Sequence, residues 1–128
     1  MSTREKIVRL LLALVGIVNL LPLAGIRSGA LLAQAYGIAA PEGDLLILMR
    51  HRALLFGVLG GLILVSAFRR HLQPAAIAAG AVSMLGFVVL AVSAGEHGPE
   101  IRKVVFIDIA ASLALLVAAA LRWKAGGR

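Results

Sequence analysis

Four long apolar stretches limit what this chain can fold into more than any other feature of its sequence. They cover about residues 6–26, 42–68, 74–95 and 102–123. Each has roughly the 20 residues that an α-helix needs to cross about 30 Å of hydrocarbon. Backbone groups that face lipid must be hydrogen-bonded within the protein, which leaves helices and closed barrels. Because the stretches show no two-residue alternation, they predict an all-α, polytopic membrane protein.

The composition excludes several other kinds of protein. Of the 128 residues, 61% are hydrophobic and only 15% are charged, too few polar side chains to cover a soluble domain. The absence of cysteine excludes disulfides, thiol redox chemistry and cysteine-ligated metals. No two histidines have the i, i+4 spacing of a helical metal site, so we expect neither a metal nor a cofactor. We also expect no nucleic-acid partner, and assign the net charge of +7 to membrane topology.

The connections between the stretches predict one membrane domain, residues 1–128, folded as an antiparallel four-transmembrane-helix bundle. Two of the three connections are short enough to force hairpins. The third is longer and holds a short helix predicted over residues 28–37. Ser28 is its expected N-cap and Gly37 its expected C-terminal residue. We expect this helix to be amphipathic and to lie at the outer membrane interface.

The distribution of lysine and arginine predicts how the bundle is oriented. Eight of these residues fall at the two termini and in the connection between the second and third stretches, against five on the opposite side. The positive-inside rule then places both termini in the cytoplasm. The eight are Arg4, Lys6, Arg9, Arg69, Arg70, Arg122, Lys124 and Arg128, and the five are Arg27, Arg50, Arg52, Arg102 and Lys103.

Polar side chains inside the stretches carry the most information about function, because they are costly in lipid. They are Asn19 in the first stretch, Arg50, His51 and Arg52 in the second, and Asp108 in the fourth. From the outer ends of their helices, Asn19 lies about 12 Å deep, and Arg50 and Asp108 about 9 Å deep. These depths predict one buried polar layer in the outer leaflet, in which Asp108 is the counter-ion of Arg50 or Arg52.

Glycine spacing predicts which helix faces pack closely. Gly57 and Gly61 have the small-xxx-small spacing that lets a neighbouring helix approach, and Gly16 offers a similar site on the first helix. Arg50 shares a face with Gly57 and Gly61. This favours Arg50 as the inward arginine, with Arg52 reaching out to the lipid headgroups.

Several segments resemble a small bacterial family of four-helix membrane proteins, the DoxX-like group. They are Val18-Asn19-Leu20-Leu21-Pro22-Leu23-Ala24-Gly25, Tyr36-Gly37-Ile38 and the run Leu45 to Gly57. Arg50-His51-Arg52 and Asp108 match the polar signature of the group, and the likeness covers nearly the whole chain. It implies a four-helix bundle in the bacterial inner membrane and quinone-linked or accessory-subunit roles.

Similar chains are sometimes labelled phosphopantetheine adenylyltransferase, and the residues here do not support that label. Such an enzyme needs a soluble nucleotide-binding α/β domain with a histidine-containing phosphate site. In this chain Gly95-Glu96-His97-Gly98 is a short loop between two membrane stretches.

Several functions remain open for the polar layer. We favour a non-catalytic protein that binds a lipid or quinone headgroup, or an accessory subunit, because pairing Asp108 leaves a cation for the ligand. One alternative is a membrane-embedded enzyme that uses His51 and Asp108 as acid and base. Another is a small proton-coupled transporter that uses Asp108. A purely structural ion pair is also open. The Gly/Ala-rich faces favour a homo-oligomer or a larger membrane complex.

Overall fold

The chain folds into helices joined by short turns, with no strand in residues 1–126, the part that the computed structural model describes. Four of the helical segments are long and apolar enough to cross a membrane, and they suggest a membrane protein. In order, the elements are α1 (Thr3–Leu20), η1 (Leu21–Ile26), α2 (Gly29–Tyr36), α3 (Gly43–Ser66), η2 (Arg70–Leu72), α4 (Gln73–Ala94) and α5 (Pro99–Gly126).

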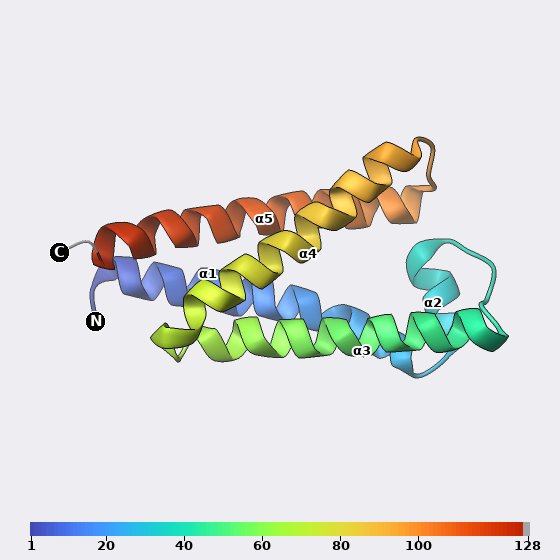
Figure 1. The fold of residues 1–128 in the computed structure, drawn as a ribbon, viewed down its shortest axis with the longest axis horizontal. Helices are drawn as coiled ribbons and strands as arrows, with labels where there is room; N and C mark the ends of the chain where they lie inside the picture. The colour runs from blue at the N-terminus through green and yellow to red at the C-terminus, as the bar shows by residue number, and fades with distance from the viewer. Residues whose placement is uncertain (127–128) are drawn as a thin grey trace.

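The long helices lie side by side, and the chain passes along the length of the molecule four times (Figure 1). Both termini lie at one end, and α2 lies at the other. Helix α1 packs against α3 and α5, and α5 also packs against α4. Helices α3 and α4 are neighbours near the turn that joins them and diverge toward the far end.

Prolines shift two of the predicted helix ends. The first span leaves α-helical geometry at Leu20 and continues as the 3₁₀ turn η1. Pro22 has no N–H to donate to the Val18 carbonyl, which accepts a hydrogen bond from the Leu21 N–H instead. Helix α5 begins at Pro99, ahead of the predicted residue 102, because proline fits the first turn of a helix, where no N–H is needed.

The predicted ends of the short helix are confirmed. The Ser28 hydroxyl accepts a hydrogen bond from the Leu31 N–H at 3.2 Å, as an N-cap does. Gly37 follows the helix with φ 63°, a left-handed conformation that glycine adopts without strain. These two residues fix the length of α2 and therefore the position of Tyr36 at its end.

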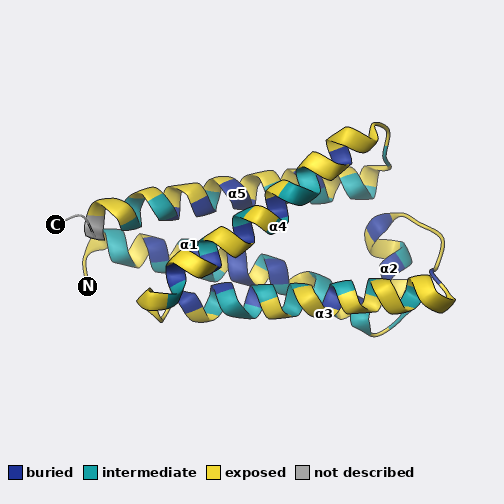
Figure 2. Cartoon of the chain, viewed as in Figure 1, coloured by how far each residue is buried: buried dark blue, intermediate teal, exposed yellow. Residues whose placement is uncertain are grey.

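The surface of the bundle is apolar, as a lipid-facing surface must be. Exposed residues cover the outer sides of the long helices (Figure 2), and many are large and hydrophobic, among them Val82 and Leu90 at 75% and 71% exposure. The buried core between the helices is small and contains Leu12, Ile63, Met84 and Leu115. So extensive an apolar surface suits hydrocarbon rather than water.

Helices α1 and α3 approach each other closely at Gly16 and Gly60. A Cβ atom on Gly60 would lie 2.8 Å from the Gly16 carbonyl oxygen, and one on Gly16 would lie 2.7 Å from the Leu64 nitrogen. At Gly61, where the spacing predicts packing, a Cβ atom would meet nothing within 4 Å. At Gly57 it would meet the Leu23 side chain at 2.7 Å. The close approach therefore uses Gly60 where the sequence predicted Gly61, about 100° further around the helix.

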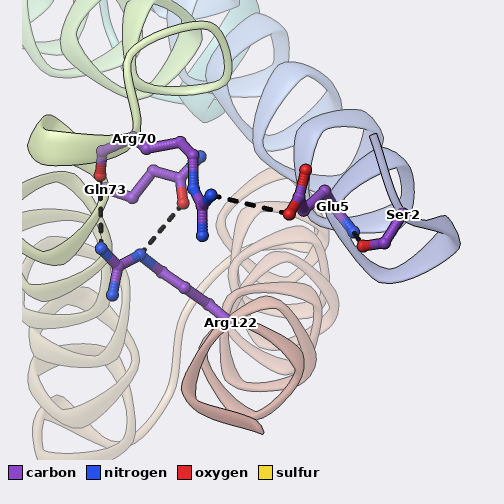
Figure 3. A network of polar contacts seen from close by, with 5 residues as sticks. All are labelled: Ser2, Glu5, Arg70, Gln73 and Arg122. Carbon is purple, nitrogen blue, oxygen red and sulfur yellow. Dashed lines mark hydrogen bonds and ion pairs between the residues drawn. The ribbon is translucent and has the colours of Figure 1, made fainter. Parts of the chain in front are cut away.

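Hydrogen bonds and an ion pair join the helices at the end that holds both termini (Figure 3). The buried Gln73 side chain donates to the Ser66 carbonyl at 3.1 Å, and its oxygen accepts from Arg122 Nε at 3.0 Å. Arg122 Nη2 also donates to the Arg70 carbonyl at 3.3 Å, and Arg70 pairs with Glu5 at 3.6 Å. These contacts, the Gln73 network, connect the start of α1, the α3–α4 turn and the end of α5.

Candidate functional site

A cavity of about 230 Å³ lies near the α2 end of the molecule, between α1, η1, α2, α3 and α5. Four polar side chains reach it, one from each of four helices: Asn19 from α1, Tyr36 from α2, Arg52 from α3 and Asp108 from α5. We call it the polar cavity. Its other lining residues are Val18, Leu21, Pro22, Ala35, Phe56, Val104 and Ile107.

Arg52 is held in this cavity by aromatic side chains. Its Nη1 donates to the Tyr36 hydroxyl at 2.6 Å. Its guanidinium carbon lies 5.1 Å from the centre of the Tyr36 ring, 4.7 Å from that of Phe56 and 5.6 Å from that of Phe87. Aromatic faces stabilise a cation at these distances. Of the five guanidinium N–H groups, one donates to a group within residues 1–126, so the others are available to a ligand.

Asp108 lines the polar cavity and makes no direct hydrogen bond or ion pair within the described residues. Its side chain is half-buried, and no group in residues 1–126 hydrogen-bonds to it or forms an ion pair with it within 4.0 Å. Asn19 beside it is buried, and its amide nitrogen donates to the Val15 carbonyl at 2.9 Å. A carboxylate and an amide oxygen thus remain as acceptors in the cavity that Arg52 also lines.

The structure reverses the predicted roles of the two arginines. Arg50 is exposed, and its Nε donates to the Ile26 carbonyl at the end of η1 at 2.7 Å. Arg52 is the inward residue. His51 is exposed and does not line the cavity that contains Asp108. Successive helical residues point about 100° apart, so only one of these three side chains can face the cavity.

An apolar groove of about 460 Å³ adjoins the polar cavity. It lies between α3 and α4, where these helices diverge (Figure 1). Arg52 and Phe56 line both spaces. The rest of the groove consists of Leu55, Leu59, Ala79, Ser83, Gly86, Phe87 and Leu90. Arg52 therefore lies where a space lined by four polar side chains meets one lined mostly by apolar residues.

The sequence predicted three of the four polar residues of the cavity, Asn19, Arg52 and Asp108, and did not predict Tyr36. The signal for Tyr36 was present, because Leu32 and Tyr36 are spaced i, i+4 on the predicted short helix and both are buried. Within the described residues, no three histidine or acidic side chains gather into a group that could hold a metal ion.

Comparison of the chain with family models, with curated proteins and with solved structures finds no match. The resemblance to the DoxX-like group therefore stays a prediction.

Proposed function

We propose that this chain is an integral membrane protein that binds an amphiphile, with the headgroup at Arg52 and the tail along the groove between α3 and α4. The observation that carries the proposal is the position of Arg52 and Phe56, which line both the polar cavity and the apolar groove. A phospholipid and a quinone each combine an oxygen-rich head with a long apolar tail. Either has the two-part chemistry that these adjoining spaces would accept.

The chemistry of Arg52 favours an oxygen-bearing head. A guanidinium at membrane depth is costly and marks functional sites in membrane proteins. Its planar N–H groups suit phosphate or carbonyl oxygens. Tyr36 accepts from Arg52, so its hydroxyl hydrogen is free to donate to the same ligand.

Replacing Arg52 with glutamine tests this function. The change removes the cation while keeping a polar side chain of moderate size. Loss of charge-assisted hydrogen bonds should reduce the amount of co-purified amphiphile at least about tenfold. The measurement is mass spectrometry of organic extracts of the protein purified in mild detergent, normalised to protein.

Arg50→Gln is the matched control, because Arg50 is on the same helix and exposed. This variant should co-purify with as much amphiphile as the wild type does. If the Arg52 and Arg50 variants co-purify with equal amounts of amphiphile, and circular dichroism shows both variants to be folded, the proposal is contradicted.

We further propose an antiparallel arrangement of four spans in a bacterial inner membrane, with both termini in the cytoplasm and α2 at the outer interface. The polar cavity then lies in the outer leaflet. The terminal end carries most of the lysine and arginine, together with the exposed Trp123, a residue enriched at membrane interfaces.

The absence of cysteine makes this topology directly measurable. We expect Ser2→Cys and Lys124→Cys to resist a membrane-impermeant maleimide in intact spheroplasts, and Glu42→Cys and Glu96→Cys to react. All four residues are exposed, so each new thiol can reach solvent. Labelling in permeabilised cells is the control and should be equal for all four. The reverse pattern in intact spheroplasts would invert the orientation.

A further inference from the structure

We infer that the headgroup is zwitterionic and carries a phosphate and a primary ammonium, as an ethanolamine phospholipid does. The inference depends on the proposed function and names the class of its ligand. Arg52 binds the phosphate, and Asp108 binds the ammonium.

The charges of the polar cavity select for such a head. One cation and one anion line it from different helices, α3 and α5, and no ion pair within 4.0 Å joins them. A head with net negative charge would pair with Arg52 and meet the like charge of Asp108. A head that carries no charge would leave the Arg52 and Asp108 charges without a direct ion-pair partner within 4.0 Å, which is costly in a membrane. A head that carries both charges can pair with both Arg52 and Asp108.

The hydrogen-bonding groups of the cavity also fall into two sets, donors that suit a phosphate and acceptors that suit an ammonium. Arg52 and Tyr36 present N–H and O–H donors, which suit phosphate oxygens. Asp108 and the side-chain oxygen of Asn19 are acceptors, and the Asn19 amide nitrogen is already bound to the Val15 carbonyl. A primary ammonium has three N–H donors for these oxygens. The tail of the lipid leaves past Phe56 into the groove between α3 and α4.

A choline head would fit this cavity less well. A trimethylammonium has no N–H donor, and proteins bind it in aromatic cages. The aromatic rings here, Tyr36, Phe56 and Phe87, lie against the Arg52 guanidinium. Asp108 therefore needs a ligand that donates hydrogen bonds.

Binding of phospholipids with identical acyl chains to the delipidated, purified full chain tests the inference. By native mass spectrometry, the wild type should bind the ethanolamine lipid about tenfold more tightly than the choline and glycerol lipids. In Asp108→Asn this preference should disappear, while binding through Arg52 persists. Asp44→Asn is the matched control, since Asp44 is exposed in the first turn of α3, and it should keep the preference.

A second measurement needs no variant. Mono-, di- and trimethylated ethanolamine lipids lose one N–H donor at each step, so the affinity of the wild type should fall along the series. A flat series, or a preference for the glycerol or choline lipid, overturns the inference and leaves the proposed function standing if Arg52→Gln still loses lipid. A purified protein that retains a quinone and no phospholipid also overturns the inference. A wild-type protein that binds no amphiphile overturns both.

Discussion

Replacing Gly60 with alanine will lower the free energy of unfolding by about 1–3 kcal/mol, the usual cost of overpacking a close contact. The added Cβ would lie 2.8 Å from the Gly16 carbonyl oxygen, 2.8 Å from the Leu20 nitrogen and 2.9 Å from the Asn19 carbonyl carbon. All three are backbone atoms, which cannot rotate away as a side chain does. Helices α1 and α3 must therefore separate. The measurement is unfolding by sodium dodecyl sulfate, followed by circular dichroism.

Gly61→Ala is the matched control for this experiment. It makes the same chemical change one residue away, where the added Cβ meets nothing within 4 Å. Its stability should equal or slightly exceed that of the wild type, because alanine has the higher helix propensity. Equal destabilisation by the two variants would mean that α3 is rotated about its axis relative to the structure described here.

Replacing Gln73 with leucine will destabilise the end of the molecule that holds the termini. The substitution removes the acceptor of the Arg122 Nε–H and the donor to the Ser66 carbonyl. Hydrogen bonds to charged groups contribute about 1.5–3 kcal/mol, and a buried group left without its partner adds to the loss. We expect a loss of about 2–4 kcal/mol in the same unfolding assay.

Gln34→Leu is the control for the Gln73 variant. Gln34 is exposed on α2, and its side chain makes no hydrogen bond within residues 1–126. It should leave the unfolding curve unchanged. A Gln73 variant as stable as wild type would show that water or lipid headgroups can replace both contacts.

The sequence predicted the spans well, because the thickness of a bilayer determines how long an apolar helix must be. It also predicted the ends of α2, since the Ser28 cap and the left-handed Gly37 are local features. The helix ends near Pro22 and Pro99 were predicted less accurately, because proline can end a helix, tighten it into a 3₁₀ turn or begin it.

Which side of α3 packs against the other helices could not be predicted from its sequence. This helix is apolar around most of its circumference, so no hydrophobic face indicates which side packs inward. Glycine spacing favoured the side of Gly61, whereas the buried residues of α3 are Ala53, Gly60, Ile63 and Ser66. Arg50 and Arg52 point about 200° apart on this helix, so the side that packs inward determines which of them faces the polar cavity. The contribution of Tyr36 depends on how α2 docks, which is a tertiary property.

The Gln73 network has a mechanical consequence for the groove. It fixes one end of α4, whereas the opposite end diverges from α3 (Figure 1). With 22 residues, α4 is a lever arm about 33 Å long. A tilt of about 5° at the fixed end would displace the far end by about 3 Å. The angle of α4 at its Gln73 end would therefore set how wide the groove opens near Arg52.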